Sequence, residues 1–392
     1  PHELVMNQSS SGILFLLSVS VGVAMIGLGI IWPLIPGYAV ELGAGGVLVG
    51  LIIASFNVSR TLVNPLAGQL SDRWGRKSFM VVGLFVYAAV SVLYVLPAHA
   101  ETLVLVRAFH GLASVLVVPI AMALAADIAP PQKLGLYMGT LNMAVMLGLG
   151  IGPVLGGTIR DHLGMNAAFY AMGILALLTC LLVIVFIPSD KQRQGAGKDQ
   201  KPYSIRKMLS HRVVLGIFLM RFLTASGQGA VYTFLPILAL QLKLTSSQVG
   251  IILGANIFLI AFLQRACGVL ADRVNPKYLI IFGTLASGMT VFGMPFVEGF
   301  LMILLLNLLM GMANGISLPG GLVITGKLGR TKGMASLMSV TDTAWSLGMI
   351  VSPILSGIIL DVFGLSYIFV IGSLLISIGG IVVAFFLRDY QP

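Results

Sequence analysis

Two ionisable side chains of opposite sign, Arg221 and Asp342, lie within long apolar stretches of this 392-residue chain. A charge inside a lipid-spanning helix costs about 3 kcal/mol on insertion scales, so such a residue is expected to have a partner or a function. A carboxyl group that alternates between an apolar environment and an arginine neighbour takes up and releases a proton. Asp342 is therefore a candidate proton carrier, and a structural hydrogen-bonding role is the alternative.

Polar residues near Arg221 follow one face of a predicted helix. Arg221, Thr224, Gln228 and Tyr232 are spaced at i, i+3, i+7 and i+11, which places them on one side of an α-helix. Because such a stripe is unfavourable against lipid, we expect it to line a central substrate cavity, with an interhelical pair as the alternative for Arg221. The other residues assigned to this cavity, or else to hydrogen bonding between helices, are Asn142, Asn256, Asn307, Asn314 and Trp345.

A second set of candidates for proton coupling lies in another apolar stretch. Arg107 is just over one turn inside it, and His110 follows one turn later. Histidine changes its charge near neutral pH in ordinary surroundings, although a single histidine is as often a packing residue. Asp127 lies at the opposite end of the same stretch and completes the set.

Membrane-spanning helices must position these residues. The chain is 58% hydrophobic and 9% charged with a mean hydropathy of +1.02, which excludes an ordinary soluble domain. The apolar residues form continuous runs of roughly 20, the length that a helix needs to cross a bilayer, without the period-two alternation of barrel strands. These runs fall at 12–36, 46–67, 78–97, 102–126, 136–159, 166–187, 213–239, 247–267, 278–296, 299–323, 334–358 and 365–387. We therefore predict an all-α membrane protein with twelve transmembrane helices.

The distribution of basic residues predicts the orientation. The net charge is +10, and 17 of the 23 Lys and Arg fall in predicted loops on one side, against Arg160 and Lys243 on the other. Loops rich in Lys and Arg face the cytoplasm, so both termini and the central loop are predicted to be cytoplasmic, in a cell (inner) membrane. Charges placed in this way give no reason to expect binding of nucleic acid.

A polar stretch divides the chain into two halves. Residues 189–212 are rich in Lys, Gln and Gly and are predicted to be a cytoplasmic linker, in part an amphipathic helix on the lipid surface. At a constant offset of 200, Gly, Pro and loop charges of residues 1–188 recur in residues 213–392. The matched pairs include Pro36 with Pro236, Gly50 with Gly250, Asp72 with Asp272, Pro153 with Pro353 and Asp161 with Asp361. The repeat predicts two six-helix bundles of related structure.

The connection after the second predicted span carries a motif. It reads Gly68-Gln-Leu-Ser-Asp72-Arg73-Trp-Gly75-Arg76-Lys77 and resembles the signature loop of the major facilitator superfamily. The resemblance implies the major facilitator fold, in which two pseudo-symmetric bundles are related by an axis along the membrane normal. In such a loop an aspartate can accept hydrogen bonds from neighbouring helix ends in one conformation and lose them in another. Gly68, Asp72, Arg73, Gly75, Arg76 and Lys77 are thus the predicted conformational gate.

A second motif lies in the fifth predicted span. It consists of Gly148, Gly152, Pro153, Gly156 and Gly157. Small residues at this spacing let two helix backbones approach closely, and the proline kinks the helix. The pattern resembles the antiporter motif of the drug:proton exporters within the same superfamily.

The fourth span opens with Leu103-x-x-x-Arg107-x-x-His110-Gly111, which is also similar to the exporter branch. Arg107 there resembles the arginine implicated in proton transfer. The chain departs from the branch in one respect, because many of those exporters carry an acidic residue in the first span and this chain has none between Val21 and Pro36.

No soluble-enzyme motif occurs: there is no Walker A loop, no GxGxxG after a strand, no zinc-ligand spacing and no HExxH. An enzyme is therefore not expected, nor is a metal or another cofactor. The resemblance implies a secondary active transporter that works by alternating access, and we predict proton-coupled efflux of small organic, drug-like compounds. The excess of arginine over acid within the spans supports an alternative, a uniporter or proton-coupled carrier of an organic anion such as a carboxylate, a phosphorylated compound or a lipid. The expected partners are a small organic substrate, protons and membrane lipids, and a monomer is expected.

Overall fold

The computed structural model describes residues 10–188, 208–332 and 334–388 of the chain. Within this described part, twelve helical segments are long and apolar enough to cross a membrane, as the apolar runs predict. The described ranges contain helices and turns but no strand, so the prediction of an all-helical chain is confirmed. The predicted linker lies outside the described residues up to position 207.

Six candidate spans come from the first half of the chain. Its helices are α1 Ser10–Ile31, α2 Leu34–Glu41, α3 Gly46–Trp74, α4 Arg76–Leu93, α5 Thr102–Val115, α6 Val118–Ile128, η1 Pro131–Lys133, α7 Leu134–Leu163 and α8 Met165–Phe186. The first span combines α1 with α2, and the fourth combines α5 with α6. Pro119 explains the second break, because a proline ring clashes with the carbonyl group four residues earlier, and that residue, Val115, is the last of α5.

The second half supplies the other six candidate spans. Its helices are α10 Arg212–Gln241, α11 Ser246–Arg273, α12 Pro276–Gly293, η2 Met294–Phe296, α13 Phe300–Lys332, α14 Met334–Phe363 and α15 Leu365–Phe386. Pro236 and Pro319 lie inside the uninterrupted helices α10 and α13. A proline at these positions therefore permits a break without forcing one.

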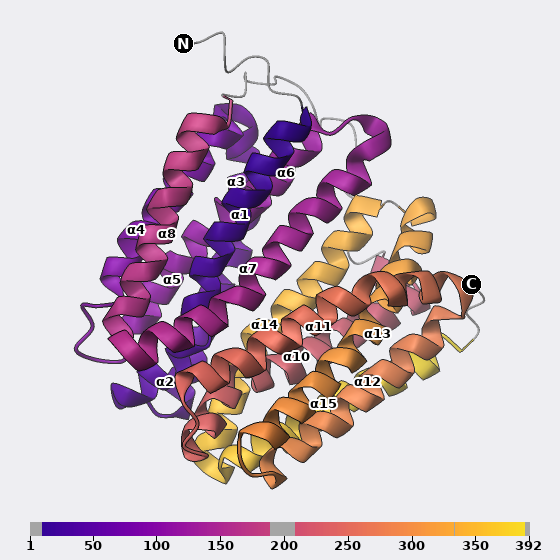
Figure 1. Cartoon of the computed structure of the whole chain (residues 1–392). Coiled ribbons are helices and arrows are strands. Elements are labelled where there is room, and N and C mark those ends of the chain that lie inside the picture. The colour runs from indigo at the N-terminus through magenta and orange to yellow at the C-terminus, as the bar shows by residue number, and fades with distance from the viewer. Residues whose placement is uncertain (1–9, 189–207, 333, 389–392) are drawn as a thin grey trace. The chain divides into compact units, whose positions relative to one another are not determined.

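The chain forms two compact units. Unit 1 comprises Pro1–Gly43, Ser55–Lys198 and Thr245–Gly254, and unit 2 comprises Ala44–Ala54, Asp199–Leu244 and Ala255–Pro392. Each unit thus contains the first turns of one helix, α11 or α3, whose remainder belongs to the other unit. Within unit 1, α1 packs on α7 and α4 packs on α8, whereas within unit 2 α15 packs on α10 and α12 (Figure 1). The division of the chain at the linker stays a prediction, because most of the linker lies outside the described residues.

Glycine residues set the close packing of α7 on α1 in unit 1. A Cβ atom added to Gly148 would lie 2.5 Å from the carbonyl oxygen of Gly22, and one added to Gly152 would lie 2.6 Å from the Cα of Gly29. Ordinary van der Waals contact begins at 3.4 Å, so only a residue without a side chain fits at these positions. The equivalent contact in unit 2 has serine in place of some of these glycines. The Ser352 hydroxyl on α14 donates a hydrogen bond there to the carbonyl oxygen of Ser226 on α10.

Candidate functional site

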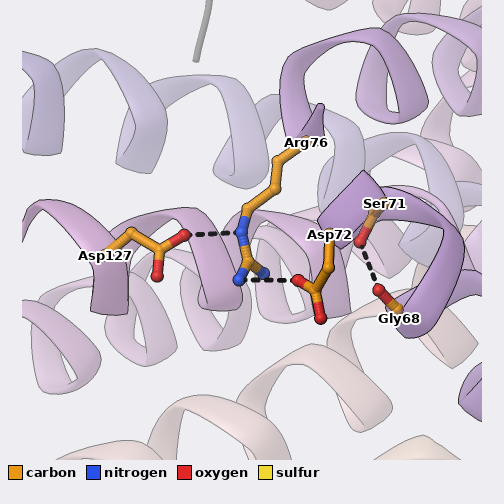
Figure 2. A network of polar contacts seen from close by, with 5 residues as sticks. All are labelled: Gly68, Ser71, Asp72, Arg76 and Asp127. Atoms are coloured by element: carbon orange, nitrogen blue, oxygen red, sulfur yellow. Dashed lines mark hydrogen bonds and ion pairs between the residues drawn. The ribbon is translucent and has the colours of Figure 1, made fainter. Parts of the chain in front are cut away.

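Arg76 joins two carboxylates at one end of unit 1 (Figure 2). Its Nη2 lies 2.9 Å from Oδ1 of Asp72, and its Nε lies 2.6 Å from Oδ2 of Asp127. The carboxylates come from the end of α3 and the end of α6, and Arg76 is the first residue of α4. The guanidinium group therefore holds three helix ends together.

The connection that carries these residues is shorter than predicted. The prediction that Gly68–Lys77 forms a loop is wrong, because α3 continues through Trp74 and α4 begins at Arg76. A helix satisfies its own backbone hydrogen bonds, so it can continue past the apolar run into a polar environment. Gly75 alone makes the connection with φ 92° and ψ 133°, a backbone conformation that favours glycine.

The other predicted gate residues lie on these two helices. Ser71 donates a hydrogen bond to the carbonyl oxygen of Gly68 at 2.8 Å (Figure 2), and Lys77 Nζ donates one to the carbonyl oxygen of Ile184 at 2.8 Å. The Arg73 side chain is exposed. The network thus connects α3, α4, α6 and α8 within unit 1.

Arg107 and His110 lie in a buried aromatic cluster of unit 1. The guanidinium carbon of Arg107 is 4.5 Å from the ring centroid of Phe56, a favourable cation–π distance. His110 Nδ1 lies 2.9 Å from the hydroxyl oxygen of Tyr94, and its ring packs edge-on against Tyr87. Both Arg107 and His110 are nearly inaccessible, with exposures of 2% and 0%.

Arg107 in this cluster has no acidic partner among the described residues. None of the ion pairs among the described residues includes Arg107, and its Nε and Nη1 have no hydrogen-bond partner there. Burying such a charge is costly unless it is compensated, and the Phe56 ring and a side-chain hydrogen bond with Tyr94 compensate it here. Asp127, predicted to act with Arg107, lies instead at the Arg76 network.

Arg221 lies near Trp345 and Asp342 in unit 2. The guanidinium carbon of Arg221, on α10, lies 5.1 Å from the centroid of the Trp345 ring, on α14. Asp342 lies one turn before Trp345, and its carboxylate interacts favourably with the charge of Arg221. A cation, an indole face and a carboxylate therefore come together from two helices.

The polar stripe on α10 forms hydrogen bonds within unit 2. Gln228 Nε2 donates a hydrogen bond to Asn314 Oδ1 at 2.9 Å, and both side chains are buried. Thr224 donates to the carbonyl oxygen of Met220 one turn earlier at 2.8 Å, so its hydroxyl group is used within α10. Asn256 Nδ2 donates to the backbone carbonyl of Asn307 at 2.6 Å.

Several buried amide atoms of this group remain unpaired. Asn256 Oδ1, Asn314 Nδ2 and both side-chain polar atoms of Asn307 have no hydrogen-bond partner among the described residues. Tyr232 and Trp345 in unit 2, and Asn142 in unit 1, are partly exposed. The two predicted uses of these residues, cavity lining and joining of helices, both stay predictions.

Sequence reasoning did not assign a role to two residues that have well-defined partners. Asp161 accepts hydrogen bonds from the first turn of α11, and Asp361 accepts them from the first turn of α3. The sequence carries a signal for them, because the same acid recurs at the offset of 200 at the ends of two predicted spans. The partners Phe56 and Tyr94 of the Arg107 cluster carry no such signal, since aromatic residues are common in spans.

Comparison with known sequences places the chain among membrane transporters. The sequence profile of the Major Facilitator Superfamily matches residues 17–223 and 217–392. An uncharacterised transporter of this type from Methanocaldococcus jannaschii is 29% identical over 374 residues, which cover 94% of this chain and 96% of the relative. Multidrug resistance protein 2 of Bacillus subtilis is 25% identical over 382 residues, with 95% and 94% covered.

A solved structure supports the fold. A bacterial homologue of the human lysosomal transporter Spinster, crystallised in an inward-facing and unoccupied conformation, matches with a TM-score of 0.77 at 14% sequence identity. The match covers 98% of this chain and 96% of the other. At this identity the likeness concerns the fold, and it confirms the predicted architecture of twelve spans.

Proposed function

Because the chain belongs to the major facilitator superfamily, we propose that it exports small, largely apolar organic compounds, cations among them, in exchange for protons. Members of this family move solutes across membranes, so the chain is a multi-pass secondary transporter and not an enzyme. The printed name of the Bacillus subtilis relative supports export of drugs. The basic loops support a cytoplasmic position of both termini in a cell membrane.

The proposal is carried by the group of Arg221, Trp345 and Asp342. The indole face already accepts one cation, the Arg221 guanidinium group at 5.1 Å, and the carboxylate already interacts with the same charge. An organic cation with an aromatic or aliphatic body offers the same two interactions. Substrate and Arg221 would therefore compete for Trp345 and Asp342.

A proton can reverse this competition. When the Asp342 carboxylate is protonated, it loses its attraction for a cation, and the substrate is released. When the proton leaves, the carboxylate again attracts either Arg221 or a new substrate. Exchange of a proton for a substrate follows from the use of one carboxylate by both, which is the coupling that an antiporter requires.

The Arg76 network supports the conformational part of the cycle. Asp72 and Asp127 are partly exposed, at 52% and 34% of their side chains, so water can replace their ion pairs at moderate cost. We assign this network to one of the two alternating conformations, in which Arg76 holds α3, α4 and α6 together. Breaking the ion pairs would free these helix ends for the other conformation.

The test uses purified protein in liposomes with an imposed pH gradient and the fluorescent cation ethidium as the probe. We expect Asp342→Asn to abolish uptake driven by the gradient while ethidium binding remains measurable, and Asp342→Glu to retain transport. Asn142→Asp provides a matched control, because it places a carboxylate at the repeat-equivalent position in unit 1, where Val21 and Val145 occupy the repeat positions of Arg221 and Trp345. Undiminished pH-driven transport by Asp342→Asn contradicts the proposal.

A second candidate function is transport of an organic anion, and the Arg107 cluster favours it. Arg107 is buried without a carboxylate partner among the described residues, and arginine forms paired hydrogen bonds with carboxylates and phosphates. Competition against bound ethidium separates the two functions. Displacement by other lipophilic cations supports export of cations, whereas displacement by benzoate or an alkyl phosphate, lost in Arg107→Gln, supports the anion carrier.

A further inference from the structure

Asp161 binds the start of a helix from the second half of the chain. It lies at the end of α7, and its Oδ1 accepts a hydrogen bond from the backbone N–H of Ser246 at 3.0 Å. Its Oδ2 accepts from the backbone N–H of Ser247 at 2.7 Å and from the Ser247 hydroxyl group at 2.6 Å. These N–H groups belong to the first turn of α11, where a helix has no internal acceptor for them. The Asp161 carboxylate therefore caps the N-terminus of α11, although Asp161 and α11 are distant in the sequence.

Asp361 makes the corresponding contact in unit 2. It lies at the end of α14 and accepts hydrogen bonds from the backbone N–H groups of Gly46 at 2.7 Å and Val47 at 2.9 Å, in the first turn of α3. Each donor and each acceptor lies 200 positions from its counterpart in unit 1. The same cap is therefore built twice, once in each repeat.

Both caps lie next to a contact in which two helix backbones approach each other directly. A Cβ atom added to Gly250 would overlap the carbonyl oxygen of Pro153, and one added to Gly50 would overlap that of Pro353. Each aspartate thus fixes a helix start that already rests directly on the backbone of its neighbour.

We propose that Asp161 and Asp361 act as a repeat-related pair of latches. Each latch holds, inside one unit, the first turns of a helix whose remainder belongs to the other unit. Opening of the latches lets the first turns of α3 and α11 leave α14 and α7 during the transport cycle. The proposal rests on the chain being a transporter and does not depend on the identity of its substrate.

The strength of the interaction suits a latch. A carboxylate at a helix N-terminus is favoured by the unpaired N–H groups and by the helix dipole. Both aspartates are exposed, so water can replace the protein hydrogen bonds when the helix start moves away. A capping residue is worth on the order of 1 kcal/mol, a factor of about five in an equilibrium at room temperature. The contact is strong enough to favour one state and weak enough to be reversed by substrate binding.

A neighbouring acidic residue provides the control. Glu41 forms an ion pair with Arg160, next to Asp161. This pair joins α2 to α7 within unit 1, and its repeat positions are Gln241 and Leu360, which form no ion pair. Glu41→Gln therefore removes an exposed carboxylate interaction at the same helix end without touching a latch.

The experiment measures the two contacts separately by double electron–electron resonance in the full-length protein, with Cys180 and Cys267 replaced by serine. One spin-label pair is placed at Leu155 and Ile251 and the other at Leu51 and Leu355, which are repeat-equivalent, exposed positions. We expect Asp161→Ala to raise the ratio of separated to docked distances about fivefold for the first pair, and Asp361→Ala to do so for the second. We expect Glu41→Gln to change neither ratio.

The transport readout and a milder variant complete the test. Asp161→Asn keeps one acceptor oxygen and loses the charge, so it should give an intermediate ratio if the alanine variant fails to fold. Unchanged spin-label distances in a variant that carries both Asp161→Ala and Asp361→Ala overturn the proposal. A change in Glu41→Gln as large as the change in Asp161→Ala overturns it as well. Loss of ethidium exchange in Asp342→Asn with normal latch distances would leave the latches intact, so the two proposals fail independently.

Discussion

Replacing Gly152 by alanine tests whether the contact between α1 and α7 holds unit 1 together. The added Cβ would lie 2.6 Å from the Cα of Gly29 and 2.6 Å from the carbonyl oxygen of Ile26. Both atoms belong to the backbone of α1, so no flexible side chain can move aside. The two helices must separate for the variant to fold.

The magnitude follows from two opposing effects. Alanine favours a helix over glycine by about 1 kcal/mol, whereas overpacking a well-packed contact costs typically about 1–3 kcal/mol. Because the overlap is with backbone atoms, we take the upper half of that range for Gly152→Ala. Gly139→Ala on the same helix has no heavy atom within 4 Å of the added Cβ, so it receives only the favourable effect. The helix-propensity gain is common to both variants and cancels, so their free energies of unfolding should differ by the overpacking cost of about 2–3 kcal/mol.

The assay is thermal unfolding in detergent, followed with a dye that fluoresces on reaction with thiols. Cys180 and Cys267 are buried and react as the helices separate. For a chain of 392 residues, a difference of this size corresponds to a gap of about 3 °C between the two melting temperatures. Equal melting temperatures for Gly152→Ala and Gly139→Ala would refute the reasoning, because they would mean that α1 and α7 are not in contact at this position.

Two further changes test local features of unit 1. Gly75→Ala should lower the melting temperature, because a residue with a side chain at φ 92° costs about 1–3 kcal/mol. Gly68→Ala, with open space around the added Cβ, should not lower it. Equal melting temperatures of the two variants would contradict the assigned backbone strain. Arg107→Met should unfold at or above the wild-type temperature. It replaces a buried charge that has no acidic partner among the described residues by an apolar side chain that can still contact Phe56. A lower melting temperature would show that the charge itself stabilises unit 1.

The number and type of the membrane spans could be predicted from the sequence, whereas the ends of their helices could not. Hydropathy detects the part of a helix that lies in lipid, and all twelve segments are found in this way. It does not detect helical residues beyond the lipid, so the sequence predicts a loop where the polar end of α3 runs from Gly68 to Trp74. The internal repeat predicts related halves, but it does not reveal that the first turns of α3 and α11 belong to the opposite unit.

The candidate site likewise has features that could be predicted from the sequence and features that could not. A partner or a function for Arg221 could be predicted, because a charge in lipid is costly, whereas the identity of Asp342 as its neighbour comes from the structure. The separation of Asp127 from Arg107 could not be predicted, since both lie in one predicted span and only the break before Pro119 and the position of Arg76 distinguish them. Unpaired amide atoms on Asn256 and Asn307 depend on side-chain orientation, which no sequence pattern specifies.

The first turns of α3 and α11 belong to a different unit from the rest of each helix, and this has a consequence for the order of synthesis. Residues Thr245–Gly254 belong to unit 1, so unit 1 cannot complete its contacts while the ribosome is still producing the first half of the chain. Asp161 emerges well before Ser246 and Ser247, and the start of α3 is made long before Asp361, its partner in unit 2. A chain divided within residues 189–207 would therefore yield two fragments that each lack part of a unit. Such fragments should be degraded when produced alone and should persist when they are produced together in one membrane.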